Sequence, residues 1–170
     1  MKEEGVLEFG QLPVLVWPED GAYLTQSNAI LRALGIRFGY YPTDPMERWQ
    51  VDSTLDAIAD IYELVAKCYF GATADAKQES LDELMGVKLP KFMSCMNTRL
   101  QGKRYMVGHT LTIADFALGS FFLQTVINEN GPHYELFLPE LQKYEHCIAF
   151  VKHFHDDNLQ YVENMIPSFF

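Results

Sequence analysis

The polar pair Gln26-Ser27 stands at the predicted beginning of a helix, where a polar side chain and the N–H groups of the first turn could both bind an anion. It precedes apolar residues at helical spacing, namely Ile30, Leu31 and Leu34. The first turn of a helix has N–H groups without intrahelical partners and carries the positive end of the helix dipole. A carboxylate is therefore a suitable ligand for this position. Taken alone, the pair favours a simpler role, in which the Ser27 hydroxyl only caps its own helix.

An acidic stripe is the second group of residues that could do chemistry. Asp52, Asp56 and Asp60 follow one another at intervals of four, which puts them on one face of a predicted helix. Three carboxylates could bind a metal ion. Like charges in such a stripe are more often simply solvated, and the sequence fixes no histidine or second acidic helix near them. We therefore expect no metal site here.

Histidines and cysteines give weaker signals. His153 and His155 stand beside two aspartates, but residues two apart on a helix point in different directions, so a solvated helix end is favoured over a metal site. Cys68, Cys95 and Cys147 are widely spaced and odd in number, which favours reduced thiols over a disulfide framework.

The composition excludes several classes of partner. The chain has 170 residues and a formal net charge of −10, which argues against binding to nucleic-acid backbones or anionic membranes. No apolar run reaches the length of a membrane span, and no basic-then-apolar leader opens the sequence. We expect a cytoplasmic protein without nucleic-acid or membrane partners.

The predicted secondary structure changes near residue 40, from a segment with strands and one helix to a segment made of helices alone. Before that point, the apolar run Val14–Trp17, a turn at 19–21 and an extended segment at 22–25 predict a β-hairpin. The helix that begins at Ser27 is expected to stop at Gly35.

The remainder reads as helical. Asp44-Pro45 begins a long helix, and a second helix is expected over 77–100, kinked or split by Pro90. Thr112 and Asp115 have the spacing of a capping box. The last helices run from Pro139 onward, with an inward stripe of Leu141, Tyr144, Ile148 and Val151.

Three segments, FGQLPVL, QSNAILR and GHTLTIADF, resemble the cytosolic glutathione transferases in order and spacing, with the pi, alpha and sigma group nearest. The resemblance covers nearly the whole chain. It implies a mostly α fold, with a truncated thioredoxin-like β-β-α unit over residues 1–39 and an all-helical glutathione-transferase C-terminal domain over residues 43–170. Members of the family are usually homodimers.

The resemblance also implies a glutathione site. Leu12 would pair its backbone with the cysteinyl part of glutathione, with Pro13 in cis. Gln26 and Ser27 would hold the γ-glutamyl end, and Asp60 would reach the glutathione of the other subunit. The complete implied set is Gln11, Leu12, Pro13, Gln26, Ser27 and Asp60.

One departure from the family bears on activity. Its members begin with a strand, a helix and a strand that carry the tyrosine, serine or cysteine activating the glutathione thiol, whereas here Phe9 already belongs to the FGQLP segment. We therefore expect glutathione as a ligand, no catalytic residue, no metal, and a non-catalytic subunit. The alternative is an active transferase or glutathione-dependent isomerase whose first elements are missing or come from another chain. Tyr62 and Tyr69 are guesses for the electrophile pocket.

Two surfaces are predicted to contact a partner. A short hairpin leaves a strand edge with unpaired backbone groups, and such edges are usually covered. We expect a homodimer or a larger complex formed through this sheet edge and through the helix Pro45–Tyr69.

Overall fold

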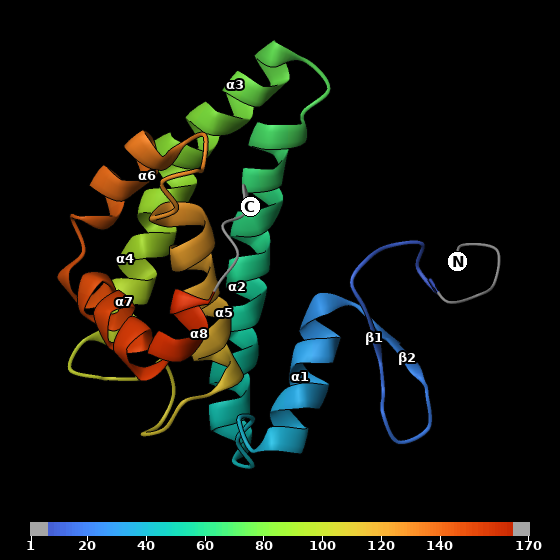
Figure 1. Ribbon diagram of the computed structural model, residues 1–170. Helices are drawn as coiled ribbons and strands as arrows, with labels where there is room; N and C mark the ends of the chain where they lie inside the picture. Colours follow the sequence, from blue (N-terminus) through green and yellow to red (C-terminus); the bar gives the residue numbers. More distant parts are fainter. Residues whose placement is uncertain (1–6, 165–170) are drawn as a thin grey trace.

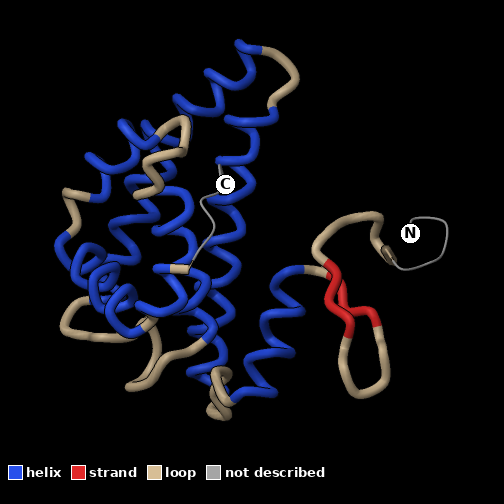
Figure 2. The backbone as a smooth tube through the Cα atoms, in the orientation of Figure 1, coloured by secondary structure: helices blue, strands red, loops and turns tan. Residues whose placement is uncertain are grey.

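The computed structural model describes residues 7–164, in which a small β-β-α unit precedes a helical domain (Figure 1). Strands β1 (Val14–Val16) and β2 (Tyr23–Thr25) pair antiparallel, with Leu15 opposite Leu24. They form the one sheet of the described residues, and it lies to the side of the helices (Figure 2). The predicted hairpin is confirmed.

Helix α1 (Ser27–Phe38) lies between the hairpin and the helical domain, and it ends later than expected (Figure 1). The predicted stop at Gly35 is wrong, because the residue in the left-handed conformation that ends the helix is Gly39, at φ 80°. Gly35 serves packing instead. A Cβ atom there would lie 2.6 Å from Cγ2 of Ile113, so only glycine lets α1 approach α5 this closely.

Helix α2 (Pro45–Phe70) is the long central helix. Asp44 begins it as predicted, since its carboxylate accepts hydrogen bonds from the N–H groups of Met46 and Glu47. The buried stripe consists of Val51, Thr54, Leu55, Ile58, Ile61, Val65 and Cys68.

The helix expected over 77–100 is split, as Pro90 suggested. It consists of α3 (Ala74–Glu83), a π-helical turn η1 (Leu84–Lys88) and α4 (Leu89–Leu100). Pro90 has no N–H to donate to the preceding turn, and that turn is wound more widely than an α-helix.

The last elements are α5 (Ile113–Phe121), a second π-helical turn η2 (Phe122–Val126), α6 (Tyr134–Leu141), α7 (Glu145–Asp157) and α8 (Leu159–Glu163). The predicted capping box begins α5. Oδ2 of the buried Asp115 accepts from the N–H and the hydroxyl of Thr112, at 2.8 and 2.9 Å. Its Oδ1 accepts from the N–H of Met106 at 2.6 Å.

The main core lies in the helical domain. Its buried apolar side chains run from Val51 to Phe154 along the sequence. Helix α7 contributes Cys147, Phe150 and Phe154, and burial raises the pKa of the Cys147 thiol to about 12. The expectation that Ile148 faces inward is wrong, because 43% of its surface is exposed.

The predicted fold class is confirmed: a two-stranded, thioredoxin-like β-β-α unit is followed by helices. None of the helices in residues 7–164 is long and apolar enough to cross a membrane. Within the same residues, no three His, Cys, Asp or Glu side chains gather as a metal-binding group would.

Candidate functional site

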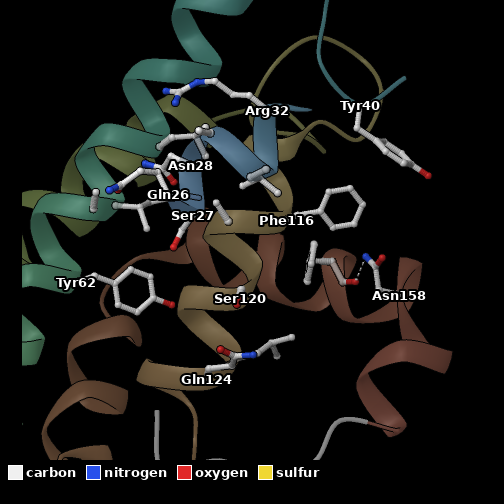
Figure 3. Close-up of a pocket in the computed structure, with 18 of the residues that line it drawn as sticks. Gln26, Ser27, Asn28, Arg32, Tyr40, Tyr62, Phe116, Ser120, Gln124 and Asn158 are labelled. Carbon is white, nitrogen blue, oxygen red and sulfur yellow. Dashed lines mark hydrogen bonds between the residues drawn. The ribbon is translucent and has the colours of Figure 1, made fainter. Parts of the chain in front are cut away.

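A cavity of about 1150 Å³ lies between α1 and the helical domain. Helices α1, α2 and α5, the turn η2 and the C-terminal helices contribute its walls (Figure 3). Gln26 and Ser27 line it, so the structure places this predicted pair in a cavity large enough for a small ligand.

The beginning of α1 is suited to an anion. No side chain among the described residues caps this helix, so the capping role considered for Ser27 is not what the structure shows. The N–H groups of the first turn, from Ser27 to Ala29, have no partners within the helix. Gln26 itself has φ 69° and ψ 112°, a positive φ that side-chain-bearing residues seldom adopt. Such strain is concentrated at ligand-binding sites.

Tyr62 lines the same cavity from α2, and its phenol oxygen points toward Ser120 in Figure 3. Its ring packs edge-on against Phe121, with centroids 5.3 Å apart. Desolvation raises the pKa of the Tyr62 phenol, while hydrogen bonds with Thr125 and Ser120 act in the opposite direction. The phenol therefore keeps its proton at neutral pH.

The rest of the lining is apolar or neutral. Phe116 and Ala117 of α5 and Leu55 and Ile58 of α2 all line the cavity. Among the described residues that line it, Arg32 is the only charged side chain. The cavity is therefore suited to a ligand with one polar end and one apolar end.

Arg32 also holds α1 to the helical domain. Its Nε lies 2.7 Å from Oδ1 of Asp52 on α2, and the hydroxyl of Tyr41 donates to Oδ2 of Asp52 at 2.9 Å. The hydrogen bond with Asp52 is the main reason that the pKa of Arg32 is raised. Part of the predicted acidic stripe thus forms an internal ion pair.

The other predicted site residues lie elsewhere. Gln11, Leu12 and Pro13 are in the loop before β1 and are not among the lining residues of the cavity. The Leu12–Pro13 peptide bond is cis, as the resemblance implied.

Asp60 and Tyr69 are also separate from Gln26-Ser27. Asp60 lines a different hollow, between α2 and α4, where Lys88 and Lys91 also lie. Tyr69, the other guess for the electrophile pocket, stacks on His133 with ring centroids 5.2 Å apart and does not line the large cavity.

Sequence reasoning missed Phe116, Ser120 and Gln124 as lining residues. They follow the Thr112–Asp115 capping box on α5 and η2, where the pattern indicates only a buried helix. Nothing in the sequence tells which turns of that helix face α1.

Comparison with known proteins decides the family. Residues 59–162 match the family described as "Glutathione S-transferase, C-terminal domain". The chain belongs to the glutathione S-transferase family. Glutathione S-transferase 1 of Ascaris suum is 36% identical over 115 residues, which are 65% of this chain and 55% of that protein. Glutathione S-transferase 2 of Caenorhabditis elegans is 33% identical over 147 residues, covering 79% of this chain and 76% of that protein.

Other relatives include enzymes named for prostaglandin synthesis. Human hematopoietic prostaglandin D synthase is 31% identical over 115 residues, covering 66% of this chain and 55% of that protein. The chain thus spans about half the length of the human synthase and of the Ascaris transferase.

Solved structures show the same fold. Rat hPGDS complexed with a quinoline has a TM-score of 0.80 at 22% identity, covering 99% of this chain and 80% of that one. The monomeric glutathione transferase Na-GST-3 of Necator americanus has a TM-score of 0.75 at 25% identity, and the match covers 99% of this chain and 82% of that one. The likeness to the rat protein concerns the fold alone.

Proposed function

We propose that this glutathione transferase-like chain binds glutathione and does not catalyse conjugation by itself. The observation that carries the proposal is the placement of Gln26 and Ser27 at the uncapped beginning of α1, on the wall of the 1150 Å³ cavity. The γ-glutamyl carboxylate would lie on the N–H groups of the first turn. The backbone of Leu12, beside the cis Pro13, would pair with the cysteinyl part, and Gln11 would contact the same tripeptide.

The electrostatics of the cavity support an anionic ligand. The chain carries a net charge of −10, yet no carboxylate is among the described residues that line this cavity. Asp60 would serve the glutathione of a second copy, because in its own chain it lines a different hollow from Gln26 and Ser27.

The absence of conjugation follows from the hydroxyl groups that the cavity offers. A glutathione thiol is activated by a hydrogen bond that stabilises its thiolate. Tyr62 lines the large cavity, whereas Leu12, whose backbone would pair with the cysteinyl part, is not among its lining residues, so the phenol does not lie beside the thiol in the proposed binding mode. We therefore propose a non-catalytic subunit, which contacts its partner through the edge of β1 and through α2.

A second candidate function is transferase or isomerase activity in a completed assembly. The apolar wall formed by Phe116, Ala117 and Ile58 favours it, since this wall lies in the same cavity as Gln26-Ser27 and could hold an apolar electrophile. The relatives named as transferases and as prostaglandin D synthase are compatible with either chemistry. A neutral Tyr62 phenol would then donate to an oxygen of the electrophile.

Calorimetry with glutathione tests the proposal. The chain should bind glutathione weakly, in the millimolar range or somewhat tighter, and the double variant Gln26→Ala/Ser27→Ala should show no binding heat. Gln78→Ala/Ser80→Ala, on the surface of α3, is the matched control and should bind as the parent does. The absence of heat in a folded parent chain would refute the proposal.

An activity measurement separates the two candidates. The chain alone should not accelerate conjugation of a generic aromatic electrophile. Turnover that appears only in a complex isolated with the chain's native partner would favour the second candidate. Turnover by the pure chain, lost in the double variant, would contradict the proposal that it is inactive alone.

A further inference from the structure

Another hollow, of about 380 Å³, lies between η2, α6 and α7. Its walls are mainly aliphatic, from Leu123, Ile127, Leu138, Leu141, Ile148 and Val151. Leu123 also lines the large cavity, so it is shared between the two. The 380 Å³ hollow contains neither Gln26 nor Ser27 and is independent of the proposed glutathione site.

Helix α7 has more apolar surface than the core uses. Its core stripe consists of Cys147, Phe150 and Phe154. A second stripe, Ile148 and Val151, faces the hollow together with Lys152 and His155. The sequence pattern indicated that Ile148 and Val151 would be buried. Val151 packs partly against the core, whereas 43% of the surface of Ile148 is exposed, and both side chains line the hollow.

The polar groups around the hollow favour a negative charge. They are the side chains of Gln142, Lys152 and His155, and no carboxylate is among the described residues that line the hollow. His155 already lies near an acid, with Nδ1 3.6 Å from Oδ1 of Asp156. Lys152 has no ion pair within residues 7–164, which leaves its ammonium group for a ligand.

We propose that this hollow binds a medium-chain aliphatic carboxylate. The aliphatic tail lies against the stripe of Ile148 and Val151 and the facing leucines, and the carboxylate bonds to the ammonium of Lys152. The volume of about 380 Å³ is within the range of small-molecule pockets. A protein partner would need a far larger area, of roughly 800 Å² on each side.

Methyl NMR with decanoate tests where the ligand binds. Ile127 and Ile148 line the 380 Å³ hollow, whereas Ile58 lines the large cavity. Decanoate below its micelle concentration should shift the methyl signals of Ile127 and Ile148 in a saturable way and leave Ile58 unchanged. A shift confined to Ile58 would show that the carboxylate enters the large cavity and would overturn the proposal.

The chain length and the charge of the probe test its chemistry. Affinity should rise about two- to fourfold with each methylene from hexanoate to decanoate, because each one buries more apolar surface. Decylamine and 1-decanol should bind more weakly than decanoate. Equal affinity for the amine and the carboxylate would overturn the assignment of Lys152.

Three variants complete the test. Lys152→Gln should weaken decanoate binding by about threefold, as expected for an exposed ion pair. Lys103→Gln, which removes a lysine from an exposed loop outside the hollow, should leave binding unchanged. Ile148→Asp should weaken binding by at least about tenfold, since it puts a charge on the aliphatic wall. Ile148 is exposed, so circular dichroism should show this variant to be folded; unchanged binding in folded Ile148→Asp would refute the proposal.

Discussion

The β-β-α unit and the helical domain differ in how they are held together. Within residues 7–38, Ile30 and Gly35 are the only buried residues. The helical domain, from Pro45 to Glu163, buries a continuous core of aromatic and aliphatic side chains. Folding free energy comes mainly from buried apolar surface, so the helical domain carries most of the stability. The β-β-α unit carries Gln26 and Ser27, the candidate residues for binding a carboxylate.

The unit presents apolar residues to its surroundings. More than half of the surface of Phe9, Leu12, Val16 and Tyr23 is exposed. Contacts of α1 attach the unit to the helical domain, among them the packing of Gly35 on Ile113, the packing of Leu31 on the core and the ion pair of Arg32 with Asp52. Changes at these contacts should therefore act on the position of α1.

Removing the Asp115 carboxylate should have the largest effect, and it should act on the helical domain. Asp115→Ala leaves two buried N–H groups, of Met106 and Thr112, without an acceptor. We expect a loss of about 3 kcal/mol in the free energy of unfolding, because each unsatisfied group costs about 1–3 kcal/mol. Urea denaturation measures it, with the exposed Asp156→Ala as the control. Equal, small losses in both variants would contradict the account of Asp115.

Crowding the contact between α1 and α5 should have the next largest effect. Gly35→Val places a side chain where Cγ2 of Ile113 already lies 2.6 Å from an ideal Cβ. Overpacking of this kind costs about 1–3 kcal/mol, and here it should displace α1. Glutathione affinity should fall along with stability. Gly86→Ala, where a Cβ meets nothing within 4 Å, is the control and should keep both. If Gly35→Val bound glutathione normally, the position of α1 would not matter for binding.

The ion pair between Arg32 of α1 and Asp52 of α2 should contribute less to stability. Arg32→Gln removes the bond to Asp52, and about a third of each side chain is exposed (31% and 35%). We expect a loss of about 0.5–1 kcal/mol in the free energy of unfolding, as for other partly exposed pairs. Amide hydrogen exchange should accelerate in α1 and stay unchanged in α5. Equal acceleration in both helices would mean that the two regions unfold as one unit.

The smallest change in stability is expected at Gln26, in the opposite direction. Gln26→Gly relieves a positive φ of 69°, and part of the gain is offset by the greater chain entropy of glycine. We expect stability to be unchanged or raised by up to about 1 kcal/mol, while glutathione binding weakens. Thermal unfolding and calorimetry on the same sample check this. A clear loss of stability would show that the Gln26 side chain supports the fold.

Local signals in the sequence predicted much of the fold. The hairpin, the Asp44 cap, the break near Pro90 and the Thr112–Asp115 box all depend on residues close together in the chain. These signals are read correctly because their partners lie within a few positions.

The errors came from contacts between distant segments. The sequence predicts a helix stop at Gly35 because the packing of this residue against Ile113, 78 positions later, leaves no local pattern. The spacing of Ile148 predicts a core position, although the core takes the neighbouring stripe of α7. The cavity walls likewise come from segments far apart in the sequence. Of the lining residues, the sequence therefore singled out only Gln26, Ser27 and one residue of α2, Tyr62.

The central claim is that the beginning of α1 binds glutathione in a chain that does not activate the thiol. A titration of the ¹⁵N-labelled chain with glutathione, followed by amide NMR, tests it most directly. The account predicts saturable shifts at the amides of Ser27, Asn28 and Ala29 that disappear in Gln26→Ala/Ser27→Ala. Saturable shifts elsewhere, or none at these three amides in a folded chain at millimolar glutathione, would contradict it.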